Sequence, residues 1–477
     1  MFELKNNKTI FFIALSLIVL HVFALYYYEL PLLYTFPFLL GGITLAFVRF
    51  DYLFFLVVFL VPLSIPMREA SPDISFDLSI PAEPLIFALM ALFFAKYLLG
   101  DIRNKKIFNH PVSIAIYCYL GWMFVTTLTS SSLLVSFKFL LARVWFVTAF
   151  YFLPLFLFNN LNNISKYIWA YLLSFIITIF YTLKNQIASG LNNQQAANYA
   201  CNPYFSDHTS YGAALALFLP LLIGYLFAIR KNKNLILKSI VVSAIVLLAF
   251  ALIYSYTRAA WLGVIVSVGF LIVVLLRIKL IYLLTVSAFL ISFFFSFQTE
   301  IMNMIQKNNN VSDKSFAKHI SSMSNVTTDV SNLERINRWK CAILMWQERP
   351  ILGWGPGTYQ FEYGAMQAAN DFTEISTFAG DRGTAHSEFL LPLSEQGVPG
   401  PIFYIIIIIV TLYTGISTFY RAKNRKIRIL VLAALAGLVT YYVHSVLNNF
   451  LDTDKLSVLF WGFTAIVVSG NIYYSKK

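Results

Sequence analysis

The feature that most constrains this chain is its series of long apolar runs. A helix needs about 20 mostly apolar residues to cross the ~30 Å hydrocarbon core of a bilayer. Of the 477 residues, 59% are hydrophobic and 12% are charged, which is more apolar surface than a soluble domain buries. A transmembrane β-barrel needs alternating segments of about ten residues instead. The sequence therefore predicts an all-α polytopic integral membrane protein.

We expect about 12–14 transmembrane helices, because some of the apolar runs are marginal in length. The predicted spans lie near residues 9–28, 31–48, 52–65, 84–99, 111–128, 139–158, 166–183, 211–229, 235–255, 259–276, 278–297, 398–418, 429–447 and 456–474. The run at 52–65 is short for a full crossing.

Charged residues alternate between the loops that join these runs. Basic residues gather in one set of loops, for example 230–233 and 421–428, and acidic residues in the other, for example 452–454. Lys and Arg are enriched in loops that stay in the cytoplasm, and this rule accounts for most of the net charge of +13. We therefore expect no nucleic-acid partner. The loops that the rule places on the outer face are 184–210, 254–260 and 298–387.

The long outer loop divides the chain into three parts. We predict an N-terminal bundle of about 11 spans at 1–297, the loop at 298–387, and a C-terminal region of about three spans at 388–477. Loops of this length are usually functional or disordered. Within the loop, apolar residues recur at helical spacing from Leu333 to Gln347. Pro350 and the glycines after it predict the end of that helix and a turn.

Four short motifs follow one another in and after this loop. They run from Arg335 to Trp339, from Pro350 to Gly357, from His386 to Leu390 and from Glu395 to Gly400. In this order and spacing, within a polytopic membrane protein, they resemble the O-antigen ligase family. That family includes O-antigen polymerases and protein O-oligosaccharyltransferases. Ser387 departs from the Asn that many relatives have at its position, which leaves the acceptor open.

His386 is the first candidate for chemistry. It is predicted to lie where the outer loop re-enters the membrane, at the start of a helical stretch from Ser387 to Leu393. A neutral imidazole can take the proton of an attacking sugar hydroxyl, and its ordinary pKa suits that role near neutral pH. The alternative is a histidine that is hydrogen-bonded at a helix start. The resemblance favours the role of general base.

Five basic residues are candidates for binding a diphosphate. Arg335 and Arg338 lie one helical turn apart, and guanidinium groups offer bidentate donors that do not titrate. Arg258, Arg143 and Lys138 lie at or near the outer ends of spans, where a cation is costly unless it is paired or faces a cavity. A solvated helix face for Arg338, and snorkelling to lipid headgroups for Arg258, are the alternatives. The resemblance assigns Arg335 the strongest claim.

Two further residues remain open. His208 is either a second acid–base group or acceptor contact, or a plain helix start beside Asp207. Glu395 either orients a basic residue or closes a turn. The pair Asp452 and Asp454 has the spacing of a metal–nucleotide motif, but no His or further carboxylate surrounds it in the sequence, and we expect no metal site.

The resemblance implies a function on the periplasmic face of the bacterial inner membrane. The enzyme would transfer a glycan from undecaprenyl diphosphate to an acceptor hydroxyl, by direct displacement with inversion and without a cofactor. We expect lipid A–core to be the acceptor, as in an O-antigen ligase. The alternatives are a polymerase, whose acceptor is another lipid-linked glycan, and a protein O-oligosaccharyltransferase. A flippase would instead show two related halves and no large one-sided loop.

Overall fold

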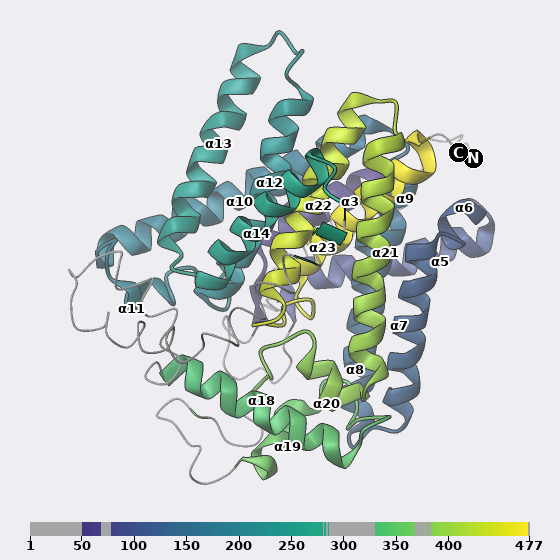
Figure 1. The fold of residues 1–477 in the computed structure, drawn as a ribbon, viewed down its shortest axis with the longest axis vertical. Coiled ribbons are helices and arrows are strands. Elements are labelled where there is room, and N and C mark those ends of the chain that lie inside the picture. Colours follow the sequence, from purple (N-terminus) through teal and green to yellow (C-terminus); the bar gives the residue numbers. More distant parts are fainter. Residues whose placement is uncertain are drawn as a thin grey trace, which may run out of the picture.

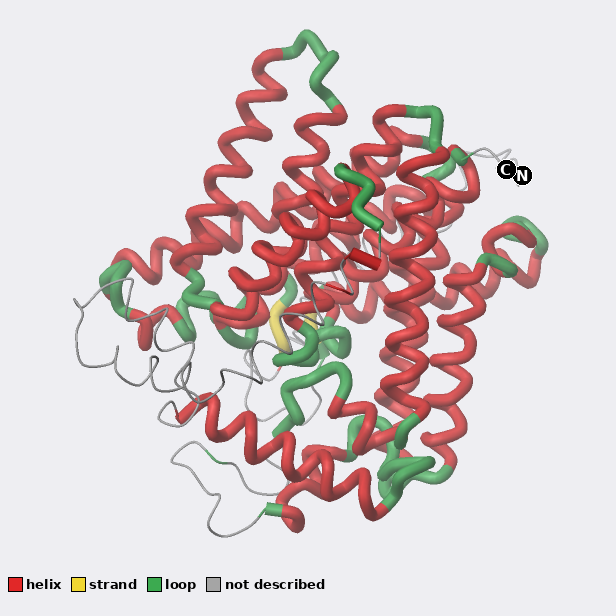
Figure 2. Tube along the Cα trace, viewed as in Figure 1, coloured by secondary structure: helices red, strands yellow, loops and turns green. Residues whose placement is uncertain are grey.

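The computed structural model describes residues 50–67, 78–279, 330–367 and 383–475, together with residues 281, 282, 285 and 376. Regular structure in these ranges is almost entirely helical (Figure 2). The two short strands of this part, β1 (Ile65–Pro66) and β2 (Ser79–Ile80), form one antiparallel pair. The predicted all-α fold is confirmed.

Within the described residues, 10 helical segments are long and apolar enough to cross a membrane. Each coincides with one of the predicted spans, and together they confirm a polytopic membrane protein. They are α5 (Ala82–Leu99), α7 (Pro111–Leu128), α8 (Leu133–Val147) with η3 (Thr148–Phe152) and α9 (Leu153–Leu157), α10 (Leu161–Ser189), α12 (His208–Ala228), α13 (Leu235–Tyr254), α14 (Arg258–Leu275), α21 (Pro399–Arg421), α22 (Arg425–His444), and α23 (Asp454–Ser469) with η5 (Gly470–Tyr474).

The predicted span at 52–65 is a shorter apolar helix. There α3 (Phe50–Leu60) continues into the single turn η2 (Val61–Leu63), because Pro62 has no N–H for the α-helical ladder. The predicted spans at 9–28 and 31–48 lie outside the described residues, as does most of the predicted span at 278–297. The two short helices α6 (Lys105–Phe108) and α11 (Gln194–Ala197) belong to connections between spans.

Helices α12, α22 and α23 form the centre of the bundle. Within their apolar windows, 72%, 78% and 83% of the residues are buried, against 28% for α13 and for α14. Small residues let the central helices approach closely: a Cβ added to Gly437 would lie 2.5 Å from Leu217 O, and one added to Gly224 would lie 2.2 Å from Ala433 Cβ. The ends of α12 and α22 are therefore held at fixed positions.

Three further helices lie at one end of the bundle: α18 (Val330–Glu348), α19 (Tyr359–Met366) and α20 (Leu390–Gln396) (Figure 1). The predicted helix from Leu333 to Gln347 is confirmed by α18, which ends before Pro350. The predicted helical start at Ser387 is wrong by three residues. The Ser387 hydroxyl accepts hydrogen bonds from Phe389 N and Leu390 N, so it precedes and caps the helix.

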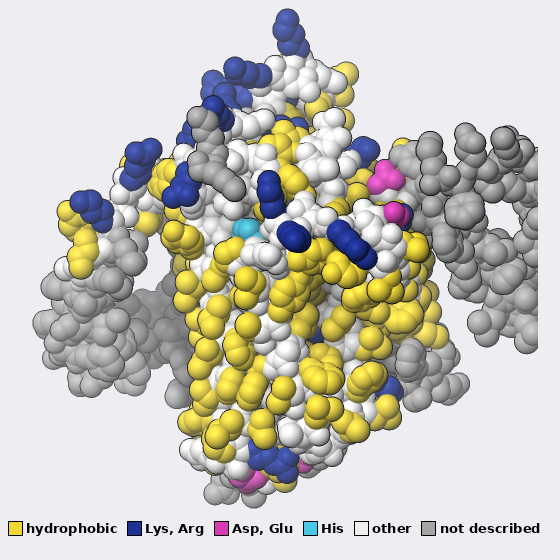
Figure 3. Space-filling view, turned by 90° about the vertical axis from the view of Figure 1, so that its right-hand side faces the viewer, with side chains coloured by type: hydrophobic (Ala, Val, Ile, Leu, Met, Phe, Trp, Pro, Cys, Tyr) yellow, Lys and Arg dark blue, Asp and Glu magenta, His cyan; other side chains and the backbone are white. Residues whose placement is uncertain are grey.

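Basic side chains gather at the opposite end of the bundle. The α12–α13 and α21–α22 turns lie there (Figure 1), and they carry exposed basic residues at 230–233 and 421–425. Figure 3 shows most of the Lys and Arg side chains of one face above a broad band of hydrophobic ones. The helices α18–α20 thus mark the less basic end of the membrane domain.

Candidate functional site

His386 lies in the turn that leads into α20. Burial lowers the pKa of its imidazole to about 3, and the positive charges of Arg338 and Arg335 act in the same direction. The ring is therefore neutral throughout the physiological pH range and can accept a proton. The ordinary histidine pKa assumed from the sequence does not include this desolvation, because sequence position does not report burial.

Hydrogen bonds to the loop between α22 and α23 hold this turn in place. His386 has a φ of 47°, in the left-handed region that costs a non-glycine residue about 1–2 kcal/mol. Such a conformation persists only where its surroundings fix it. The bonds that fix it are Glu388 N to Ser445 O (2.8 Å), Phe450 N and Leu451 N to Glu388 Oε1 (2.9 and 2.8 Å), Tyr441 OH to the same oxygen (2.8 Å), and Thr384 Oγ1 to Asn449 Oδ1 (2.7 Å).

Arg338 ties α18 to the same turn. It is 6% exposed, and its Nε donates to Glu334 Oε1 at 2.9 Å while its Nη1 donates to Thr384 O at 3.3 Å. Its guanidinium carbon also lies 5.5 Å from the centre of the Tyr363 ring. The solvated helix face considered from the sequence is therefore excluded. With one carboxylate already beside it, Arg338 is placed to position the turn that carries His386.

Arg335, on α18, lies within electrostatic range of three imidazoles, those of His386, His208 and His444. The positive charge of Arg258 is also within electrostatic range of the His208 imidazole. The N-termini of α12 and α14 are joined because Thr257 Oγ1 donates to His208 O at 2.7 Å. These groups come from five separate segments of the chain, and we call them together the charged site.

His444 belongs to the charged site and is absent from the sequence-based candidates. It ends α22 and is 1% exposed. The signal that could have found it is an ionisable residue inside an apolar span, which marks a functional position by default. Glu388 was also missed, although it lies within the His386 motif.

Glu395 closes a turn, the second of the two roles considered from the sequence. Its Oε1 accepts from Tyr359 N at 3.0 Å, while Gly355 N donates to Glu395 O at 2.7 Å. A Cβ added to Gly353 would lie 2.2 Å from the Glu395 carbonyl carbon, so the Pro350–Gly357 turn packs directly on α20. Burial raises the pKa of the Glu395 carboxyl to about 8.

Arg143 occupies a second buried cluster. It is 5% exposed, its guanidinium carbon lies 5.1 Å from the Phe139 ring centre, and the carboxylates that act on it are Glu388 and Asp452. Lys138 lies on the same helix, α8, and is exposed. The charges that shift the pKa of His386 most are those of Arg338 and Arg335 on α18 and of Asp207. None of these residues lies on α8. Arg143 is within electrostatic range of Glu388, which makes it a candidate countercharge for that carboxylate.

The acidic pair considered as a metal motif is divided between two sets of partners. Asp452 Oδ2 accepts from Asn449 Nδ2 at 3.3 Å, whereas Asp454 Oδ2 accepts from Ser64 Oγ at 2.6 Å. Lys455 Nζ donates to the same serine oxygen at 2.6 Å. In the part of the chain that the structure describes, no group of three or more His, Cys, Asp or Glu side chains could hold a metal ion.

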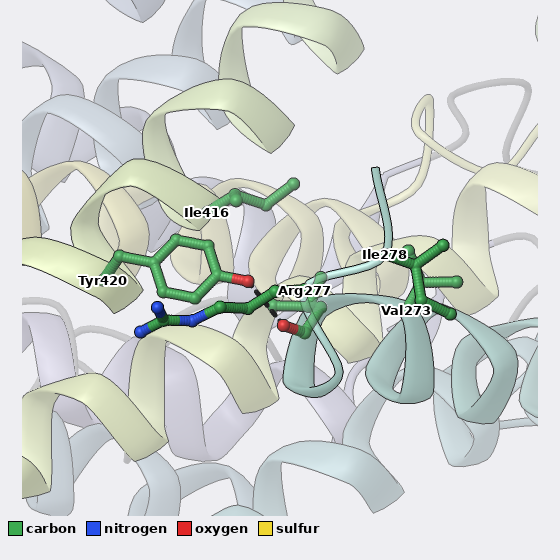
Figure 4. Close-up of a pocket in the computed structure, with 6 residues that line it drawn as sticks. Val273, Arg277, Ile278, Ile416 and Tyr420 are labelled. Carbon is green, nitrogen blue, oxygen red and sulfur yellow. Dashed lines mark hydrogen bonds between the residues drawn. The ribbon is translucent and has the colours of Figure 1, made fainter. Parts of the chain in front are cut away.

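A pocket of about 380 Å³ lies far from the charged site, between the ends of α14 and α21 (Figure 4). Tyr420 OH donates to Val274 O there, and the Arg277 guanidinium carbon lies 5.2 Å from the Tyr420 ring centre. Arg258 begins α14 and the pocket lies at its other end, about 27 Å away for a helix of this length. We therefore exclude this pocket from the candidate site.

Comparison with known proteins agrees with the motifs. Residues 243–405 match the family model described as O-antigen ligase. The matched region runs from α13 into α21 and contains Arg258, Arg335, Arg338, His386 and Glu395. No curated protein matches the chain. This match supports the resemblance found in the sequence: residues 243–405 are similar to the O-antigen ligase family.

Proposed function

We propose that this membrane glycosyltransferase of the O-antigen ligase and polymerase type moves a glycan from undecaprenyl diphosphate to an acceptor hydroxyl. The observation that carries the proposal is a half-buried His386 that is kept neutral by desolvation and by the nearby positive charges of Arg338 and Arg335. A neutral imidazole is the form that can take a proton. Fixed positive charge is what a diphosphate leaving group needs.

In this proposal the charged site performs one displacement. His386 takes the proton from the acceptor hydroxyl as its oxygen attacks the anomeric carbon of the glycan. The bond from that carbon to the diphosphate oxygen breaks, and the electron pair leaves with the diphosphate. Attack opposite the leaving group inverts the anomeric centre. The diphosphate leaves readily as a stable anion, so the proposal assigns no metal to the reaction.

Arg335 and Arg258 are assigned to the diphosphate. Arg335 is the cation shared by His386, His208 and His444, and Arg258 begins the helix that adjoins His208. Arg338 is assigned to the turn, since it bonds both Glu334 and Thr384 O. Arg143 is assigned to Glu388. His208 and the exposed Lys138 are left for contacts with the acceptor or the lipid headgroups.

Transfer by purified protein in lipid vesicles tests the proposal directly. The donor is an undecaprenyl-diphosphate-linked glycan, and three acceptors are offered separately: lipid A–core, a second lipid-linked glycan, and a serine-containing peptide. Product on the first indicates a ligase, on the second a polymerase, and on the third a protein O-oligosaccharyltransferase. No glycosylated product with any of the three would contradict the proposal. The anomeric configuration of the product, read by NMR, tests inversion.

We expect binding of the diphosphate to raise the pKa of His386. An anion beside Arg335 and Arg338 offsets the positive charge that lowers this pKa, and it favours the imidazolium. In protein that carries ¹³C-labelled histidine, the His386 signal should stay constant from pH 5 to pH 8 without ligand, because its pKa is about 3. An ordinary histidine, with a pKa of about 6.5, is about 97% protonated at pH 5. With farnesyl diphosphate bound, the signal should titrate at a higher pH.

The chain has six histidines, so the His386 signal can be assigned by its loss in a His386→Gln variant. A titration midpoint near 6.5 in the protein alone would show that the ring is solvated. The same midpoint with and without farnesyl diphosphate would show that the ligand does not bind beside it.

We expect the end of the bundle that carries α18–α20 to face the periplasm. Its opposite end carries the exposed basic turns at 230–233 and 421–425, and such turns stay in the cytoplasm. In a variant without its native cysteines, a thiol reagent that cannot cross the inner membrane should label Lys340→Cys and not Lys423→Cys. Both positions are exposed, so accessibility on the molecule is matched. The reverse labelling would overturn the assigned orientation.

A further inference from the structure

His444 has one ring nitrogen bonded and one unused. Its Nε2 lies 3.1 Å from Asn448 Nδ2. An amide nitrogen only donates, so Nε2 accepts, and the neutral ring must carry its proton on Nδ1. That Nδ1 has no hydrogen-bond partner among the described residues, although the side chain is 1% exposed. Asn448 therefore fixes a tautomer whose N–H group is free to donate.

A buried donor without a partner is costly, and natural proteins rarely keep one without a use. The position of His444 also disfavours relaxation of the ring away from the site. It ends α22, one of the central helices, and Gly437 and Gly224 bring α22 and α12 together without room for movement. The ring is thus held in place with its N–H available.

The end of α22 adjoins the turn that carries His386. Glu388 N donates to Ser445 O at 2.8 Å, and Ser445 directly follows His444. Arg335 lies within electrostatic range of both His386 and His444. A ligand anion held by Arg335 beside His386 would therefore be near the end of α22, where the Nδ1–H of His444 is unused.

We propose that His444 binds the diphosphate of the glycan donor and donates its Nδ1–H to one of the phosphate oxygens. This inference rests on the proposed function, since Arg335 is assigned there to the diphosphate. No proton is transferred: the hydrogen bond stabilises the negative charge that the diphosphate gains as the glycosidic bond breaks. The arginines attract the diphosphate by their charge, and the hydrogen bond from His444 also orients one phosphate oxygen.

Two amide substitutions separate this role from a structural one. In His444→Asn, the side-chain amide reaches about as far as Nδ1 and can still donate there. In His444→Gln, the longer amide reaches the position of Nε2, so it keeps the contact with Asn448 and loses the donor at Nδ1. The probe is farnesyl diphosphate, a short polyprenyl diphosphate without a sugar, and its binding to the purified protein is measured by calorimetry.

We expect His444→Gln to weaken binding of farnesyl diphosphate about 10- to 100-fold, the range for a lost hydrogen bond to a charged group. His444→Asn should stay within about fivefold of the unmodified protein, since it keeps a donor. His444→Leu, which has the shape of Asn without its amide, should behave like His444→Gln. Thermal unfolding of each variant verifies that the fold is retained.

The outcomes distinguish this inference from the proposed function. Equal binding in the Gln and Asn variants, while the unmodified protein transfers glycan, would overturn the role of His444 and leave the function standing. Weaker binding in His444→Gln by a protein that transfers no glycan would support the diphosphate contact and refute the transfer reaction. An unmodified protein that does not bind farnesyl diphosphate would overturn both.

Discussion

Replacement of His386 by Ala is expected to slow glycan transfer about 10²- to 10⁴-fold, the usual contribution of a general base. Binding of the lipid-linked donor should remain nearly unchanged, because the arginines assigned to the diphosphate are intact. The measurement is the rate of transfer by the purified variant at saturating donor and acceptor. Donor binding is measured separately with farnesyl diphosphate.

The backbone at His386 calls for a second variant. With a φ of 47°, this position disfavours Ala, whereas Asn adopts positive φ more readily. His386→Asn should therefore lose transfer to the same extent while keeping the turn, since its amide is not a base. A smaller loss in the Asn variant would assign part of the Ala effect to the backbone.

His110 provides the matched control. It begins α7, where its Nδ1 accepts from Val112 N at 3.2 Å, and it takes no part in the charged site. Asn is among the preferred residues at helix N-caps, so His110→Asn should keep the cap of α7 and transfer glycan at nearly the normal rate. Normal transfer by His386→Ala would reduce His386 to a helix-start residue, the alternative that its sequence position leaves open.

The spans could be predicted because their signal is local. Each needs only a run of apolar residues of sufficient length, and the 10 apolar helices of the described residues all fall where such runs lie. The exact first residues of the helices were less predictable. Ser387 was predicted inside a helix, but its hydroxyl caps the helix from outside, and sequence periodicity does not show which way a hydroxyl points.

The candidate site was predictable only in part. Arg335 and His386 could be found because they belong to motifs in one stretch of the chain. His444 could not be placed with them, since it meets Arg335 only when α22 packs in the centre of the bundle. Desolvation and the charges of Arg338 and Arg335 lower the pKa of His386 to about 3, far from the ordinary value expected from its residue type.

The substrate-binding role expected for Arg143 stays a prediction, and the structure adds a second role that the sequence did not suggest. A buried cation near the end of a span was expected to bind substrate. The structure places carboxylates near it, those of Glu388 and Asp452. Both are distant from Arg143 in sequence, so no local pattern could distinguish a substrate contact from a countercharge.

Arg335→Lys and Arg258→Lys are expected to weaken binding of the donor diphosphate by about 2–5 kcal/mol each, the scale of truncated charged contacts. This corresponds to roughly 30- to 5,000-fold in the dissociation constant. Lys keeps the positive charge, but a point ammonium cannot reproduce the planar, bidentate donors of a guanidinium. Calorimetric titration with farnesyl diphosphate measures the loss, and the rate of glycan transfer should fall with it.

Two other arginines on or beside α18 serve as controls for this prediction. Arg349 is exposed and stacks on Trp354, with 4.0 Å between its guanidinium carbon and the ring centre. Arg349→Lys should bind the donor normally, because exposed contacts of this kind are worth only about 0.5–1 kcal/mol and this one lies away from the charged site. Arg338→Lys should instead lower the unfolding temperature, since it removes buried bonds to Glu334 and Thr384 O.

The binding and transfer data for these variants separate the contribution of positive charge from that of guanidinium geometry. If Arg335→Lys and Arg258→Lys bind farnesyl diphosphate normally and transfer glycan at full rate, both residues are excluded from the site. If only the Arg258 variant is normal, the diphosphate is held by Arg335 alone, and the N-terminus of α14 packs beside the site without contacting it. Weak binding in the Lys variants, together with normal binding in Arg349→Lys, would show that the guanidinium fork itself is required.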